Sequence, residues 1–146
     1  MQQLIRPLFF FTALLCLLSS CKKIQEDLLL EGTWKLTAYY LDTMQTNFME
    51  NVLPDYKNCT GRCEYIIDFK ENEQLEGRYY TFDSLRYIKS GIWQNLEYEK
   101  IYIKLDNYVD GDYYISRYDA KNYMLISNNN LFFNARLRVR LMVEKL

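Results

Sequence analysis

Residues 135–143 read Ala-Arg-Leu-Arg-Val-Arg-Leu-Met-Val, and small or apolar side chains occupy every second position. Successive side chains of a β-strand point to opposite faces of a sheet, so this alternation predicts a strand with one buried, apolar face. The opposite face carries Arg136, Arg138 and Arg140. We therefore expect a half-buried strand that presents a row of arginines to solvent.

Similar strand patterns recur through nearly the whole chain after Glu31. The segments that carry them are 33–40, 65–69, 75–82, 87–96, 101–105, 113–118 and 123–127. The chain also contains 14 tyrosines, a residue type that favours strands. Asp110-Gly111 and Asn128-Asn129-Asn130 predict hairpin turns between strands. Only residues 42–59 form a long interruption, where a short helix or a lid-like loop is expected.

Eight strands joined mostly by short turns predict an all-β fold, an antiparallel up-and-down β-barrel spanning residues 31–146. A meander of this length leaves two exposed edge strands unless it closes on itself, and closure into a barrel removes both edges. A two-sheet sandwich is the alternative. It would need several long crossover connections, whereas only residues 42–59 are long enough to provide one.

Two Gly-x-Trp motifs give this barrel a family resemblance. Gly32-Thr33-Trp34 opens the first strand, and Gly91-Ile92-Trp93 lies in a middle strand. In an eight-stranded meander these motifs resemble the lipocalins, and more closely the lipocalin-like domains of small bacterial lipoproteins. The resemblance implies that Gly32 and Trp34 close one end of the barrel. It also implies that a small, often apolar ligand binds at the open end.

The N-terminus has the pattern of a secretory signal peptide, predicted to span residues 1–20. Arg6 precedes an apolar core at residues 8–18, which is too short to cross a bilayer of about 30 Å as a helix. Leu18-Ser19-Ser20-Cys21 resembles the lipobox of bacterial lipoproteins, which implies acylation of Cys21. Residues 21–30 would then be a lipidated tether, and two or more acyl chains would hold the protein stably at a membrane.

The residues after Cys21 bear on which membrane is used. Lys22 follows the cysteine, in place of the aspartate associated with inner-membrane retention in some Gram-negative bacteria. Glu26 and Asp27 resemble the charged tether of some outer-membrane and surface lipoproteins. We therefore expect an outer-membrane lipoprotein of the bacterial cell envelope, facing either the periplasm or the cell surface.

The composition excludes several classes of function. The chain has no histidine, so Ser-His-Asp triads, Cys-His dyads and zinc sites with histidine ligands are impossible. Carboxylate pairs remain as an acid-base device, but Glu71, Glu73 and Glu76 cluster in or beside a turn, where charged tips stay in water. With 18 basic and 19 acidic side chains, the chain lacks the basic surface that nucleic acid requires. We expect a monomer without enzymatic activity, metal or cofactor.

Cys59 and Cys63 are predicted to form a disulfide around Gly61, because an envelope protein folds in an oxidising compartment. A ring this short contributes only about 2 kcal/mol on the chain-closure model. A redox pair would have a two-residue spacing, and a metal site would need further ligands. Both alternatives are therefore disfavoured.

Two functions remain as hypotheses. In the first, the barrel holds a small apolar ligand in an internal cavity, and the residues expected to bind it are Tyr40, Met44, Phe48, Met49 and Trp93. In the second, the barrel is filled by its own side chains and serves as a protein-interaction or inhibitor module. Its contact surface would then be the arginine strand or the Cys59–Cys63 loop, and its partner another envelope protein.

Overall fold

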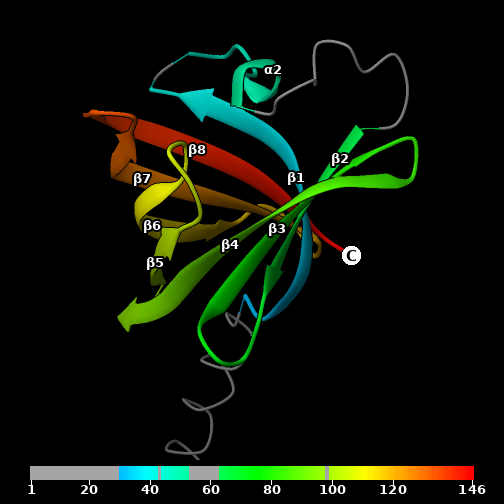
Figure 1. The fold of residues 1–146 in the computed structure, drawn as a ribbon. Coiled ribbons are helices and arrows are strands. Elements are labelled where there is room, and N and C mark those ends of the chain that lie inside the picture. The colour runs from blue at the N-terminus through cyan, green and yellow to red at the C-terminus, as the bar shows by residue number, and fades with distance from the viewer. Residues whose placement is uncertain (1–29, 43, 53–62, 98) are drawn as a thin grey trace, which may run out of the picture. The chain divides into compact units, whose positions relative to one another are not determined.

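The computed structural model describes residues 30–42, 44–52, 63–97 and 99–146. In this part of the chain, eight strands form one closed antiparallel barrel in chain order (Figure 1), which confirms the predicted all-β up-and-down fold. The elements are β1 (Gly32–Leu41), α2 (Met49–Val52), β2 (Cys63–Phe69), β3 (Gln74–Thr81), β4 (Ser84–Glu97), β5 (Lys100–Lys104), β6 (Asp110–Arg117), β7 (Asn122–Phe132) and β8 (Ala135–Lys145).

The two ends of the barrel follow from this topology. Every strand is antiparallel to its neighbours, and β1 also pairs with β8. The β1–β2, β3–β4, β5–β6 and β7–β8 connections therefore lie at one end, which we call the rim. The β2–β3, β4–β5 and β6–β7 connections lie at the other end, which we call the base.

Alternation places apolar side chains in the core, as β8 illustrates. Val139, Leu141 and Val143 are at most 1% exposed, whereas Arg136 and Arg138 are exposed. The other strands supply a matching set of buried residues, which includes Leu36, Ile67, Phe69, Leu75, Ile101, Ile103, Ile115 and Leu125. The strands therefore form because each has one face to bury, and burying these faces together favours the closed barrel.

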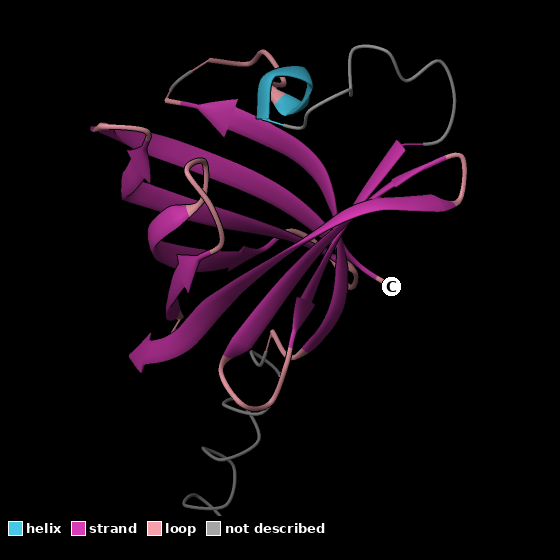
Figure 2. Cartoon of the chain, in the orientation of Figure 1, coloured by secondary structure: helices cyan, strands magenta, loops and turns pink. Residues whose placement is uncertain are grey.

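The interruption after β1 contains a short helix, which Figure 2 shows as the single helix among the described residues. Met49 and Val52 of α2 are each 3% exposed. The preceding residues extend the sheet beside β1, since the Phe48 amide donates to the Tyr39 carbonyl at 2.7 Å. Residues 53–62 lie outside the described part of the chain.

Two predicted turns are wrong. Asp110 and Gly111 begin β6, and the connection before it is residues 105–109. Asp106 makes that turn, because its Oδ1 accepts hydrogen bonds from the amides of Tyr108 (2.8 Å) and Val109 (3.1 Å). A carboxylate bonded to the backbone two residues ahead stabilises a turn without glycine.

The second wrong prediction is the turn at Asn128-Asn129-Asn130. These residues lie inside β7, where the register against β8 shifts between Ser127 and Asn130. The shift is a β-bulge, in which extra residues of one strand oppose fewer on its neighbour. Asn130 is turned into the barrel there and is 0% exposed.

The N-terminal predictions are not tested by this structure. Residues 1–20, Cys21 and the tether up to residue 29 lie outside the described residues. Residues 31–146 form a compact unit of their own, which contains every strand of the barrel. No helix among the described residues is long and apolar enough to span a bilayer.

Candidate functional site

The inside of the barrel is filled by aromatic side chains. Tyr39, Tyr79 and Tyr113 are 0% exposed, and Trp34 and Trp93 are 1% and 3% exposed. Rings of this size each bury a large apolar surface and occupy the centre of a small barrel. They take up the space in which the first sequence hypothesis places an apolar ligand.

A hydrogen-bond network joins Tyr39, Tyr113 and Asn130 in the barrel interior near the rim. The Tyr39 hydroxyl donates to the Tyr108 carbonyl at 2.6 Å, and Asn130 Nδ2 donates to the same oxygen at 2.9 Å. Asn130 Oδ1 accepts from the Tyr113 hydroxyl and, at 2.9 Å, from the Asp110 amide. Buried polar groups that are paired in this way fix one arrangement of the interior.

The buried tyrosines are poor acid-base groups. Burial raises the pKa of Tyr39, Tyr65 and Tyr113 well above the ordinary value of 10.0, and the negative charge of Asp106 raises each of the three further. At neutral pH these phenols are therefore protonated. The Tyr39 and Tyr113 hydroxyls donate hydrogen bonds, and none of the three phenols is ionised to serve as a base or nucleophile.

An ion pair links β4 to the β5–β6 connection. Lys89 Nζ lies 2.5 Å from Asp106 Oδ2, and these side chains are 26% and 16% exposed. The same ammonium lies 5.5 Å from the centroid of the Tyr87 ring and 5.6 Å from that of Tyr108. A cation held by a carboxylate and two aromatic faces is well stabilised. The pair therefore fixes the β5–β6 connection against β4.

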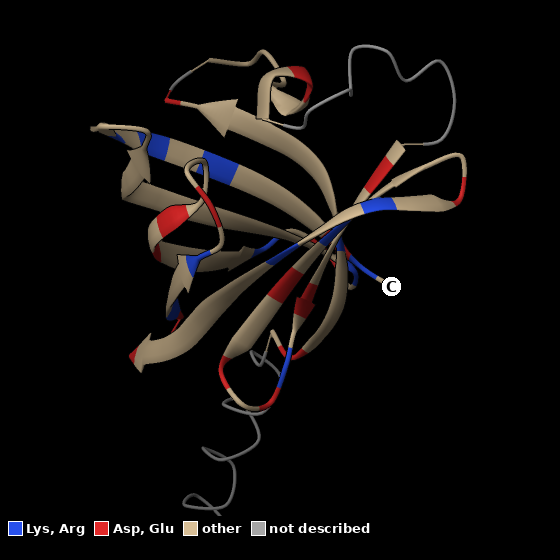
Figure 3. Ribbon diagram, in the orientation of Figure 1, with Lys and Arg blue, Asp and Glu red and all other residues tan. Residues whose placement is uncertain are grey.

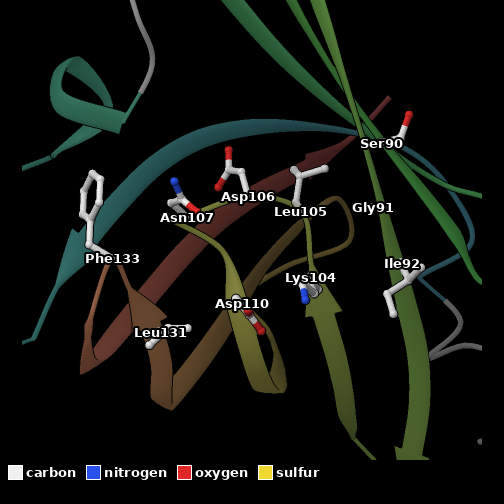
Figure 4. A pocket seen from close by; sticks show the side chains of 10 residues that line it. All are labelled: Ser90, Gly91, Ile92, Lys104, Leu105, Asp106, Asn107, Asp110, Leu131 and Phe133. Carbon is white, nitrogen blue, oxygen red and sulfur yellow. The ribbon is translucent and has the colours of Figure 1, made fainter.

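A pocket of about 520 Å³ opens in the side of the barrel next to this ion pair (Figure 4). We call it the lateral pocket. Its lining combines β4, the end of β5, the β5–β6 connection, the start of β6, the end of β7 and the β7–β8 hairpin: Ser90, Gly91, Ile92, Lys104, Leu105, Asp106, Asn107, Asp110, Leu131 and Phe133. Pockets that bind small molecules commonly have volumes of about 300–1,000 Å³.

The lateral pocket exists because β4 is much longer than β5. β4 has 14 residues and β5 has 5. The two strands pair only from Ile92 opposite Lys104 to Glu97 opposite Lys100. Residues 84–90 continue toward the rim paired with β3, and no described strand pairs with their other edge. The β4 edge and the lateral pocket are therefore contiguous.

Gly91 lies at the point where β4 and β5 part. A Cβ atom there would overlap the Lys104 carbonyl oxygen and lie 2.9 Å from Leu105 Cα. Only a glycine permits so close a backbone approach. This close approach explains the glycine of the second Gly-x-Trp motif.

The residues predicted to bind ligand do not come together. Tyr40 and Met44 lie near the rim, where the Arg140 guanidinium is 5.2 Å from the Tyr40 ring centroid and donates to the Met44 carbonyl at 2.9 Å. Met44 is 54% exposed. Trp93 lies toward the base, where its Nε1 donates to the Lys70 carbonyl at 2.9 Å.

The remaining predicted ligand residues, Phe48 and Met49, lie beside β1. Phe48 is half-buried, and Met49 is 3% exposed at the start of α2. None of the five predicted residues lines the lateral pocket. The sequence does not predict the pocket, because four strands and two connections supply its walls.

Gly32 and Trp34 lie at the base, at the start of β1. The Trp34 ring packs edge-on against Tyr123 with centroids 5.0 Å apart, and Lys145 Nζ lies 5.5 Å from its centroid. Gly32 has a φ of 116°, a conformation that side chains disfavour. The cation over Trp34 is thus Lys145. It lies two residues beyond the alternating segment 135–143, so the alternation of that segment does not point to it.

The cysteine prediction is tested at one of its two residues. Cys63 is disulfide-bonded, and the Tyr79 hydroxyl donates to its Sγ at 3.3 Å. Cys59 lies outside the described residues, so its pairing with Cys63 stays a prediction.

The acidic residues considered for catalysis lie in solvent. Glu71 and Glu73 are exposed, and a hydrogen bond from Lys70 (2.8 Å) lowers the pKa of the Glu76 carboxyl. A general acid at neutral pH needs the opposite shift. Among the described residues, no group of three or more acidic or cysteine side chains is placed to hold a metal ion.

Comparison with known proteins adds no relative. No family model matches the chain, and neither the curated proteins nor the solved structures include a significant match. The resemblance to lipocalin-like lipoprotein domains therefore rests on the two Gly-x-Trp motifs and the barrel.

Proposed function

We propose that this protein is a lipid-anchored binding protein of the bacterial cell envelope, and that it binds a small amphipathic molecule in the lateral pocket. The support is one contrast within the barrel. Its interior holds buried tyrosines, of which Tyr39 and Tyr113 are hydrogen-bonded to the Tyr108 carbonyl and to Asn130, whereas a pocket of about 520 Å³ is open on its side. The ligand site thus moves from the interior, where the sequence suggested it, to the wall.

The lining of the lateral pocket suits a ligand with an apolar body and a polar group. In Figure 4, Leu131 and Phe133 lie across the pocket from Ile92, and these three side chains offer an apolar surface. Lys104 and Asp110 offer charges of both signs beside it. A few placed polar groups on an apolar wall are the usual means of orienting a small ligand.

The proposed role is binding without catalysis. The buried tyrosines are held protonated, and the pKa of Glu76 moves away from the range that a general acid needs. Together with the absence of histidine from the sequence, these features leave the described residues without an activated base or nucleophile.

Two isoleucines on the outer face of β4 provide a matched test. Ile92 lines the pocket and is 46% exposed. Ile88 lies four residues earlier on the same face of β4, outside the pocket, and is 52% exposed. The chain from Lys22 to Leu146 would be isolated from the envelope of its own host and weighed by native mass spectrometry. We expect a co-purifying small molecule that Ile92→Arg removes and Ile88→Arg retains.

A second function, the protein-interaction module, is favoured by residues 84–90 of β4, which pair with β3 but with no other described strand. A strand edge offers free amides and carbonyls to a chain that adds alongside it. Leu85 and Ile88 are 47% and 52% exposed on this segment. A clean apo mass, together with a cross-linked envelope partner that Ile88→Arg abolishes and Ile92→Arg spares, would favour this function and contradict the first.

A further inference from the structure

The rim connections project apolar side chains into solvent. Met44 follows β1, Phe82 lies in the β3–β4 hairpin and Phe133 lies in the β7–β8 hairpin. These side chains are 54%, 57% and 52% exposed. Large exposed apolar side chains in three separate connections are unusual, because turns are normally polar.

The backbone at the two hairpin tips makes phenylalanine an unfavourable choice. Phe82 has a φ of 51° and Phe133 a φ of 54°. A bulky side chain in this left-handed region costs about 1–2 kcal/mol, whereas asparagine and glycine tolerate it. The backbone conformation therefore does not explain the phenylalanine at either position.

A strip of unneutralised arginines adjoins Phe133. Arg136, Arg138 and Arg140 follow it along the outer face of β8, where Figure 3 shows blue positions near the rim. Arg136 donates to the Asn129 carbonyl and Arg140 to the Met44 carbonyl, which are uncharged acceptors. In the described part of the chain, none of the three forms an ion pair.

We propose that the rim docks on an anionic lipid surface. Met44, Phe82 and Phe133 would enter the boundary between headgroups and acyl chains, and the three arginines would bind lipid phosphates. Side chains that enter this boundary gain from leaving water, and guanidinium groups bind phosphate with two parallel hydrogen bonds. This contact involves the barrel alone and does not require acylation at Cys21. Phe133 also lines the lateral pocket, whereas Met44 and Phe82 do not.

The shape of the surface favours a bilayer over a protein groove. The three apolar tips belong to connections that follow different strands around the rim, and they do not form one continuous patch. A fluid, planar partner can receive separate tips. The position of the Phe133 ring is fixed by two edge-on contacts. Its centroid lies 5.1 Å from that of Tyr108 and 5.2 Å from that of Phe132.

Because acidic side chains also lie at the rim, membrane binding requires both the arginines and the apolar side chains. Asp42 and Asp83 are exposed beside β1 and Phe82, so they oppose attraction to an anionic surface. We therefore expect the arginines alone to give weak binding, and the apolar tips to add the larger part. Binding should also weaken as salt increases, because exposed charges are screened.

Vesicle flotation tests the proposal. All the barrel strands lie between Gly32 and Lys145, so the unacylated chain from Lys22 to Leu146 retains the fold. We expect it to float with vesicles of phosphatidylglycerol and phosphatidylcholine, and to float less with phosphatidylcholine alone. Phe82→Asn should weaken binding at least tenfold, and Arg138→Gln about fivefold.

Two exposed residues at the opposite end serve as controls. Tyr118 is 73% exposed in the β6–β7 connection, and Lys121 is exposed three residues later. Tyr118→Asn and Lys121→Gln should float like the unmodified chain. Phe82→Asn should melt no lower than that chain, because asparagine suits the positive φ, and its loss of binding would then not reflect unfolding.

Three results would overturn the proposal. The first is an unmodified chain that stays unbound with anionic vesicles. The second is a Phe82→Asn variant that is as stable as the unmodified chain and floats equally well. The third is a control at the base that loses as much binding as the rim variants do.

Discussion

At the scale of single residues, Asn130 connects more of the barrel interior than any apolar side chain could. Its amide accepts from the Tyr113 hydroxyl and the Asp110 amide, and it donates to the Tyr108 carbonyl. These partners come from β6 and from the connection before it. One amide from the bulge in β7 therefore fixes the position of two neighbouring segments.

Replacing this amide should be costly. Asn130→Ala leaves the Tyr113 hydroxyl and the Asp110 amide without their acceptor, and each such buried group costs about 1–3 kcal/mol. We expect Asn130→Ala to lower the free energy of unfolding in urea by about 2–4 kcal/mol. Asn128→Ala, at an exposed position in the same strand, should change it by less than about 0.5 kcal/mol. Equal losses in the two variants would contradict the network.

At the scale of elements, the length difference between β4 and β5 creates the candidate site. The first seven residues of β4 run past the end of β5, and the last of them, Ser90, lines the lateral pocket. The Lys89–Asp106 pair holds the β5–β6 connection near that edge. The ion pair therefore fixes two walls of the lateral pocket, β4 and the β5–β6 connection, relative to each other.

The close approach at Gly91 gives the element-scale prediction. In Gly91→Ala, the new Cβ meets backbone atoms of Lys104 and Leu105, which cannot move without shifting β5. Overpacking of this kind costs about 1–3 kcal/mol. We expect that loss in urea denaturation, with little change for Ser90→Ala, which removes one exposed hydroxyl. A Gly91→Ala variant of unchanged stability would mean that β4 and β5 are farther apart.

The same elements separate what the sequence could predict from what it could not. Alternation located the strands because each buries one face, and eight of them in meander order allowed the barrel to be predicted. Dipeptide turn signals failed at Asp110-Gly111 because Asp106 forms the turn, and at Asn128–Asn130 because a bulge absorbs the polar residues. The lateral pocket was not predictable, since it depends on where two strands stop pairing.

At the scale of the whole molecule, closure of the barrel encloses side chains from all eight strands in one interior. Its tyrosines become interior groups that are held protonated. Tyr39, Tyr65 and Tyr113 all have a raised pKa in the folded protein, and burial is the main cause for each. The stability of the barrel therefore depends on pH on the alkaline side.

The sign of this dependence follows from proton binding. Above about pH 10 an unfolded tyrosine loses its proton, whereas these three keep theirs in the folded barrel, so the unfolded state is favoured. Each should cost about 1.4 kcal/mol per pH unit above pH 10. We expect circular dichroism to show cooperative alkaline unfolding, and phenolate absorbance to rise in the same transition. Full phenolate formation before unfolding would contradict the buried positions.

The pairing of β1 with β8 has a consequence for synthesis and export. These strands come from opposite ends of the domain, with Trp34 opposite Lys145, so the last eleven-residue strand must be present before the first can be enclosed. A chain that crosses a membrane N-terminus first cannot complete this barrel while its C-terminus is still behind. Contacts so distant in sequence also form slowly. On the proposed route of export, β1 would keep an open edge until β8 has crossed the membrane.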